Sequence, residues 1–254
     1  MDAIFQYTSL ESLAMILKEK KIRFSNLCLL DDPLEKFIKI RNYDSSDHHL
    51  TYIRKNYGKF CFVSCWTYEK EESIAMWDMY GDRKKGVRIA MPLGMFDKNY
   101  NINSASGKNR SILSKKTIQA VQPEFIKVEY NRLDDPKITT DDWKVQIGNL
   151  GKYKMKDWEF QKECRFRLYA AKTKDEKNEC WFIPPKGKSM DEMILKTPST
   201  KEYIDFPIEE EAFKYMEIME GPSITESKKV LLDALLNQFE IDNSKRFKSK
   251  YHVD

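Results

Sequence analysis

The amino-acid sequence predicts an α+β fold, and three observations lead to that class. Segments with the aromatic and β-branched residues of strands outnumber segments with helical periodicity. The two kinds of segment do not alternate regularly along the chain, as they would in a parallel α/β fold. Glycine accounts for only 9 of the 254 residues, which argues against Rossmann and P-loop folds, because these need glycines where the backbone meets a phosphate.

Composition places the chain among globular proteins. Charged residues amount to 33% and hydrophobic residues to 41%, which excludes disordered and fibrous classes. The 44 basic and 40 acidic residues give a net charge of +4, too small by itself to indicate nucleic-acid binding. For this length we expect a single domain over residues 1–254, with a core over 1–170 and a strand–helix–strand appendage over 200–254 packed on it.

Cysteine and histidine usage bears on compartment and metal chemistry. The five cysteines are odd in number and form no C-x-x-C pair, which is typical of a reduced chain and not of a disulfide framework or a zinc site. The sequence shows no signal peptide and no apolar run long enough for a transmembrane helix. It contains only three histidines, which speaks against a histidine-based metal centre. We therefore expect a cytoplasmic protein with no membrane segment and no metal.

The N-terminal quarter predicts strand, helix and strand in succession. Residues 4–7 have the aromatic character of a short strand. Thr8 and Glu11 have the spacing of a capping box, and apolar residues recur at helical spacing as far as Leu17. Residues 22–25 then predict a second strand.

The remaining chain predicts further elements of both kinds. Residues 60–66 are dense in strand formers and poor in charge, which favours a central strand. Helices are expected at 34–43, 72–80 and 225–239, with a weak one at 140–153. Other strands are expected at 86–91, 125–130, 163–169, 180–183, 203–206, 213–219 and 241–247. Polar composition predicts exposed loops at 44–49 and 99–116.

Two groups of residues combine aromatic rings with hydroxyls. The first is Tyr7-Thr8-Ser9, which forms either one wall of a pocket or a core tyrosine followed by a helix cap. The second is Ser64-Cys65-Trp66, followed by Trp77 and Tyr80. These side chains form either a cleft that stacks a planar ring, with Ser64 bonding an amide of that ring, or an aromatic core.

A third group lies between Trp158 and Arg165. If Gln161, Glu163 and Arg165 lie on a strand, the two-residue period places all three on one face. An amide, a carboxylate and a guanidinium are costly to bury unless they pair with one another or serve a site. The alternative is a surface ladder formed by Glu163 and Arg165.

In their order along the chain, these motifs resemble a large, mostly bacterial family that is catalogued only as a domain of unknown function. The motifs occur here as Tyr7-Thr8-Ser9, Asp31-Asp32-Pro33-Leu34-Glu35, Ser64-Cys65-Trp66, Trp77 with Tyr80, Gly86-Val87, Trp158 to Arg165, and Gly221-Pro222. The resemblance covers nearly the whole chain. Two positions depart from the pattern, because Asp31 stands where the family has Asn and Gln161 where it has Glu.

A more distant likeness is to ADP-ribosyltransferases, through the opening strand–helix–strand, the serine-bearing central strand and the late Gln161-Lys162-Glu163. It implies a mixed, mainly antiparallel split sheet with flanking helices, and NAD as co-substrate. Glu163 would be the catalytic carboxylate that bonds the nicotinamide ribose and favours the oxocarbenium-like transition state. Gln161 would orient the acceptor. The residues implied to bind NAD are Tyr7, Thr8, Ser64, Trp77, Tyr80 and Arg165.

The likeness implies a macromolecular acceptor, either protein or nucleic acid, and by analogy a toxin or anti-phage role. Two other functions stay open. One is a catalytically inactive module of the same fold that binds a nucleotide or a partner. The other is a metal-dependent nuclease using Asp32, Glu35 and Glu163, which ranks last because no D…E-x-K arrangement falls on the expected strands. The sequence leaves the oligomeric state open.

Overall fold

The structure of the chain is a computed structural model. It describes residues 2–32, 34–44, 49–100, 102, 121–131, 139–140, 147–172, 179–182 and 198–252. Within these ranges no helix has both the length and the apolar character needed to cross a membrane. The cysteines at positions 28, 61, 65 and 164 are free thiols, as expected for a chain without a disulfide framework.

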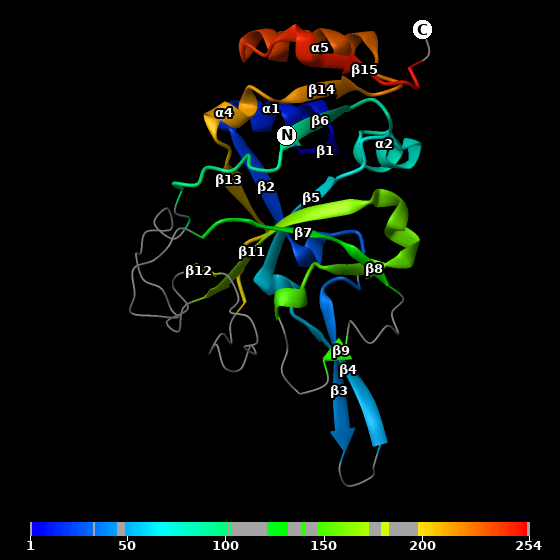
Figure 1. Cartoon of the computed structure of the whole chain (residues 1–254), viewed down its shortest axis with the longest axis vertical. Coiled ribbons are helices and arrows are strands. Elements are labelled where there is room, and N and C mark those ends of the chain that lie inside the picture. The colour runs from blue at the N-terminus through cyan, green and yellow to red at the C-terminus, as the bar shows by residue number, and fades with distance from the viewer. Residues whose placement is uncertain are drawn as a thin grey trace.

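One mainly antiparallel sheet of ten strands dominates the described chain (Figure 1). Its main path runs in the order β12-β11-β5-β1-β6-β14-β15, while β2, β7 and β13 pair at its sides. Every pair in this sheet is antiparallel except β14 with β15. The bounds are β1 Ala3–Thr8, β2 Lys21–Asn26, β5 Cys61–Thr67, β6 Val87–Pro92, β7 Glu124–Lys127, β11 Glu163–Lys172, β12 Glu179–Phe182, β13 Tyr203–Pro207, β14 Glu217–Glu220 and β15 Arg246–Lys248. This sheet confirms the predicted α+β class with mainly antiparallel pairing.

The helices are few and short. The described chain contains α1 (Leu10–Glu19), α2 (Ile74–Tyr80), α4 (Glu210–Phe213) and α5 (Glu226–Gln238). Short 3₁₀ segments occur in the connections, at η1 (Leu27–Leu29), η2 (Gly58–Phe60), η4 (Ile147–Asn149), η5 (Lys156–Gln161) and η6 (Asn243–Lys245). A hairpin of β3 (Phe37–Asp44) and β4 (His49–Asn56), with β9 (Thr139–Thr140) beside β3, projects from the end of the molecule opposite α5 (Figure 1). β8 (Glu129–Asn131) and β10 (Tyr153–Met155) form a separate parallel pair.

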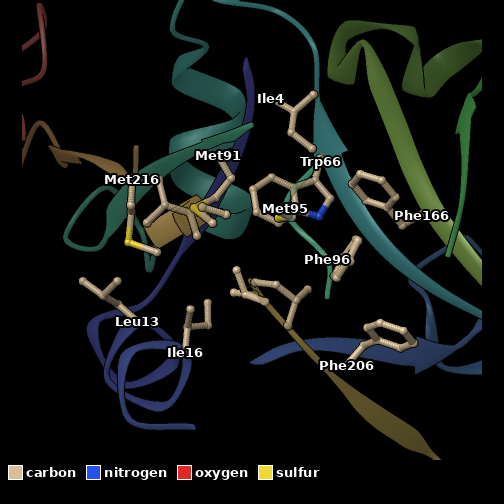
Figure 2. Close-up of a cluster of buried hydrophobic side chains, with 14 of the residues drawn as sticks. Ile4, Leu13, Ile16, Trp66, Met91, Met95, Phe96, Phe166, Phe206 and Met216 are labelled. Atoms are coloured by element: carbon tan, nitrogen blue, oxygen red, sulfur yellow. The ribbon is translucent and has the colours of Figure 1, made fainter. Parts of the chain in front are cut away.

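The main hydrophobic core lies between one face of the large sheet and helices α1, α4 and α5. α1 begins after Ser9, whose side-chain oxygen accepts a hydrogen bond from the backbone N–H of Ser12 at 3.2 Å. The apolar residues of α1 recur at helical spacing, so Leu10, Leu13 and Leu17 lie buried on the face of the helix that packs on the sheet. Figure 2 shows how side chains of α1 lie opposite those of the sheet, with Ile4, Leu13, Ile16, Trp66, Met91, Met95, Phe96, Phe166, Phe206 and Met216 in one cluster.

The large sheet divides along β5. β1 pairs with β5 at Thr67, and β2 pairs with it at Val63. Residues 64–66 of β5 lie between these two pairing points, and no described strand pairs with them on the side of β5 that faces β1 and β2. The side-chain amide of Gln6 instead donates a hydrogen bond to the carbonyl oxygen of Cys65 at 2.9 Å. Because α1 connects β1 to β2, the helix spans the gap between them.

Four predicted elements are wrong in whole or in part. Residues 241–247, predicted as a strand, contain the 3₁₀ segment η6 and only the first two residues of β15. The described part of the predicted weak helix over 140–153 contains the end of β9, the 3₁₀ segment η4 and the first residue of β10.

Residues 34–43, predicted as a helix, contain most of strand β3. The alternation of isoleucine with a basic residue over 38–41 is a strand pattern that outweighed the helix-start signal before it. Residues 213–219, predicted as a strand, contain the end of α4 and only the first part of β14. The cap of α1 is also displaced by one position, because Thr8 is still part of β1.

The segment over residues 200–254 is built into the large sheet. β13 pairs with β2, and β14 pairs with β6, so the two strands join the sheet at separate places. α5 contributes Leu232 and Leu236 to the main core. Residues 45–48 of the predicted loop over 44–49, residues 101 and 103–116 of the predicted loop over 99–116, and residues 141–146 of the predicted weak helix lie outside the described residues.

Gly86 permits a close approach between the turn before β6 and the end of β1. A Cβ atom on Gly86 would lie 2.2 Å from the carbonyl oxygen of Thr8. We therefore expect Gly86→Ala to destabilise the protein by about 1–3 kcal/mol in urea unfolding, because the backbone must shift. Gly94→Ala is the matched control, since nothing lies within 4 Å of its added Cβ. Equal losses in the two variants would contradict the close approach.

Candidate functional site

A cleft of about 510 Å³ opens where β1 and β2 separate from β5. Its walls come from α1, β1, β2, β5, α2 and the start of β11. Polar and charged side chains in its lining include Tyr7, Thr8, Arg23, Asp31, Ser64, Tyr80, Lys154, Gln161, Glu163 and Arg165. All the site residues expected from the sequence line this cleft except Trp77.

Four buried charged residues form a network at the inner end of the cleft. Arg165 Nε donates to Glu163 Oε1 at 2.6 Å, and Arg165 Nη2 donates to Glu163 Oε2 and Glu35 Oε1 at 3.0 Å each. Arg165 Nη1 also donates to Glu35, and to the carbonyl oxygen of Gly151 at 3.0 Å. Lys154 Nζ lies 3.1 Å from Glu163 Oε2 and 3.3 Å from Glu35 Oε1. Two carboxylates and two cations therefore neutralise one another.

The network fixes the charge of its members. Burial raises the pKa of Glu163, but the charges of Arg165 and Lys154 outweigh burial and hold this pKa at about 2. Burial lowers the pKa of Arg165, while Glu163 and Glu35 raise it well above its ordinary value. Both groups are therefore ionised at neutral pH. An ionised carboxylate held in a low-dielectric site interacts strongly with positive charge that develops nearby.

Neutral polar groups extend the network into the cleft. Lys154 Nζ donates to Gln161 Oε1 at 2.7 Å, and Gln161 Nε2 donates to the hydroxyl oxygen of Tyr80 at 2.8 Å. Burial and the charges of Asp31 and Glu163 raise the pKa of Tyr80, so its hydroxyl stays protonated. Because the Tyr80 oxygen accepts from Gln161, its proton is available for donation to a ligand.

The third predicted group comes together, although not on one strand. Gln161 ends η5, and Lys162 has a left-handed φ of 44°, so β11 begins only at Glu163. The predicted strand over 163–169 is confirmed, but the condition that Gln161 also lies on it is not met. Glu163 and Arg165 do share a strand face, as predicted. They are 4% and 0% exposed, so the alternative of a surface ladder is wrong.

Ser64 lies on the opposite face of the sheet from Glu163. Directly paired residues on neighbouring strands share a face, and Ser64 pairs with Phe166 whereas Glu163 pairs with Thr67. The Ser64 hydroxyl oxygen accepts a hydrogen bond from the indole N–H of Trp66 at 3.0 Å, on the core side. Ser64 therefore belongs to the floor of the cleft, where the sheet divides, and its hydroxyl is not directed at Glu163.

Tyr7 and Trp77 attach α2 to β1. The Tyr7 hydroxyl oxygen accepts a hydrogen bond from the backbone N–H of Ser73 at 3.1 Å, and its ring packs edge-on against Trp77 with centroids 4.8 Å apart. Trp77 is fully buried, and its indole N–H donates to Glu72 at 2.8 Å. Because α2 carries Tyr80, these contacts hold the cleft wall in position. Trp77 acts from behind that wall and not within the cleft.

Lys154 was not among the site residues expected from the sequence, and Glu35 was expected only as part of a family motif and as a metal-ligand candidate. Lys154 lies on β10, a strand of three residues that no periodic pattern marks. The sequence did offer a local signal for Glu35. This residue ends the Asp-Asp-Pro-Leu-Glu motif, and a turn at Asp-Asp-Pro does not by itself require a carboxylate two residues later. Its role depends on a partner 130 residues away in the sequence.

No protein-family model, curated protein or solved structure matches the chain. The site is therefore interpreted from its own chemistry. Among the residues that the structure describes, no three His, Cys, Asp or Glu side chains gather in a way that could hold a metal ion. Glu35 and Glu163 are bonded to Arg165 and Lys154, which favours the other two functions over a nuclease.

Removal of Arg165 would leave two buried carboxylates opposite a single lysine. We expect Arg165→Met to lower the free energy of unfolding by about 3–5 kcal/mol, measured in urea, because the lost cation leaves buried charge uncompensated. Arg23→Met is the control: its pair with Asp205 is solvent-exposed, and its loss is expected to cost less than about 1 kcal/mol. A loss as small for Arg165→Met as for the control would show that Arg165 does not neutralise the network.

The depressed pKa of Glu163 predicts how stability varies in acid. The folded-state pKa is about 2, compared with an ordinary value of 4.5. Glu163 therefore contributes stability that is fully present above the ordinary value and is lost as the pH falls toward the folded-state value. Between these limits we expect the unfolding free energy of the wild type to fall more steeply with decreasing pH than that of Glu163→Gln. Parallel curves in urea titrations across this window would contradict the assignment.

Proposed function

We propose that the protein is an ADP-ribosyltransferase-like enzyme that uses NAD to modify a macromolecule, with Glu163 as its catalytic carboxylate. One observation carries the proposal. β1, β5 and β11 are neighbours in the sheet, and they bring Tyr7, Ser64 and Glu163 from distant parts of the chain to a single cleft. The likeness to ADP-ribosyltransferases requires this convergence of three motifs.

The chemistry of Glu163 supports the role. As nicotinamide leaves NAD, positive charge develops on the ribose, and a fixed, ionised carboxylate stabilises that charge. Gln161 and the hydroxyl of Tyr80 lie beside the network and are suited to orient the ribose or the acceptor. Tyr7 and Arg165 serve as positioning residues, because Tyr7 holds α2 and Arg165 holds Glu163.

Binding without turnover is the second candidate, and the hydrogen bonding of Glu163 favours it. Its two carboxylate oxygens already accept hydrogen bonds from Arg165 and Lys154. A carboxylate has about four lone-pair sites, so these donors leave little capacity for a ribose hydroxyl. On this alternative the cleft binds a nucleotide or a partner, and the network only shapes its inner end.

Incubation with NAD and a panel of candidate protein and nucleic-acid acceptors distinguishes the two functions. The enzyme is expected to release nicotinamide, and Glu163→Gln to reduce release about 100-fold or more, because the variant removes the charge and keeps the shape. A binding module is expected to gain thermal stability with NAD and to release no nicotinamide. Absence of both release and stabilisation would overturn the enzyme and any function in which the cleft binds NAD.

Controls separate catalysis from folding. Glu226→Gln removes an exposed carboxylate outside the cleft and should release nicotinamide at the wild-type rate. Tyr80→Phe keeps the ring, removes the hydroxyl and should lower release about tenfold or more. Stabilisation of Glu163→Gln by NAD shows that its cleft is intact. Wild-type release from a folded Glu163→Gln would overturn the catalytic role.

A further inference from the structure

The charged side chains that line the cleft limit the kind of molecule that it can bind. The lining carboxylates belong to Glu11, Glu19, Asp31, Glu163 and Asp205, and the lining cations to Lys21, Arg23, Lys154 and Arg165. Lys154 and Arg165 are neutralised within the buried network. Arg23 Nε donates to Asp205 at 2.9 Å. Three of the four lining cations, at the inner end of the cleft and on β2, are therefore already paired with carboxylates.

The carboxylates left outside these pairs are exposed at the cleft wall. Glu19 has Lys18 as its ion-pair partner in the described chain, at 3.9 Å with both side chains exposed. The backbone N–H at the start of α1 lowers the pKa of Glu11, which keeps this carboxylate ionised. Asp31 is exposed and makes no ion pair with any described residue. Lys21 is the lining cation outside these pairs, whereas Lys18 beside Glu19 and Lys228 near Glu11 do not belong to the lining. The lining itself therefore carries more negative than positive charge in this part of the cleft.

α1 arranges two of these carboxylates as an extended strip. Glu11, Ser12, Met15, Ile16 and Glu19 face the cleft along the helix. Glu11 and Glu19 are eight residues apart, which separates their backbone positions by about 12 Å along the helix axis. Met15 lies between them and is 49% exposed. The strip therefore presents a carboxylate at each end and an apolar side chain in the middle.

We infer that the acceptor is a basic segment of a protein. Its lysine or arginine side chains would pair with Glu11, Glu19 and Asp31, and an apolar side chain between them would pack on Met15. A nucleic acid requires lysines and arginines to neutralise its phosphates, and here Lys21 is the lining cation left for that purpose. The inference deepens the proposed function and rests on it for the identity of this segment as the acceptor.

Fluorescence anisotropy in the absence of NAD tests the inference with three probes: a basic peptide with interspersed leucines, an acidic peptide of equal length, and a single-stranded oligonucleotide. We expect the protein to bind the basic peptide alone, with an affinity that falls as salt rises. Glu11→Lys combined with Glu19→Lys should weaken this binding about tenfold or more. The binding measurement needs neither NAD nor turnover. The protein can therefore release nicotinamide without binding the basic peptide, or bind the peptide without releasing nicotinamide, and the two proposals are tested separately.

Glu226→Lys is the matched control. Glu226 lies in the first turn of α5 as Glu11 does in α1, but outside the cleft, so the helix-terminus effect is similar and binding should change less than about twofold. If the variant with both Glu11→Lys and Glu19→Lys does not fold, Glu11→Gln combined with Glu19→Gln removes the two negative charges without adding positive ones. This variant should weaken binding several-fold. Equal affinity of wild type and folded variant for the basic peptide, or tighter binding of the oligonucleotide, would overturn the inference.

Discussion

Arg165 lies fully buried between Glu35 and Glu163, and its guanidinium is bonded to both. Burying four charges is expensive, and a well-packed apolar cluster is often as stable as a buried ion network. The effect of this network is therefore positional. It joins the segment before β3, strand β10 and the start of β11, which are distant in sequence.

The division of the large sheet supplies the space that the network borders. A continuous sheet would cover the edge of β5 with another strand and leave no cleft. Here β1 and β2 diverge, α1 spans the gap, and the side chain of Gln6 satisfies a carbonyl that a neighbouring strand would otherwise bond. The cleft consequently has two chemically different parts. Its inner end is neutralised by ion pairing, and its wall along α1 is acidic.

These two parts suit different molecules. A charge-balanced inner end with a fixed carboxylate suits chemistry on a small co-substrate, because the carboxylate acts on charge only where it develops. An exposed acidic wall suits recognition of a larger, positively charged partner, because such charges steer association and set specificity. The proposed transfer from NAD to a basic protein segment uses both parts of one cleft.

Several features of the site could be predicted from local pattern. Glu163 and Arg165 share a face because strand side chains alternate with a period of two, and this rule needs no partner strand. Gln161 could not be placed in this way, because the left-handed Lys162 interrupts the strand just before Glu163. Lys154 carries no local signal, and its importance arises from its distances to Glu35 and Glu163.

By itself, the sequence determined the α+β class, the central strand and the shared strand face of Glu163 and Arg165, since composition and periodicity are local properties. Only the tertiary structure decided which face each side chain occupies and which charge neutralises which. Ser64 illustrates the first point, because its pairing with Phe166 turns its hydroxyl away from Glu163. Arg165 illustrates the second, because Glu35 reaches it from 130 residues away. Register between strands and contacts between distant segments depend on packing, which no local pattern encodes.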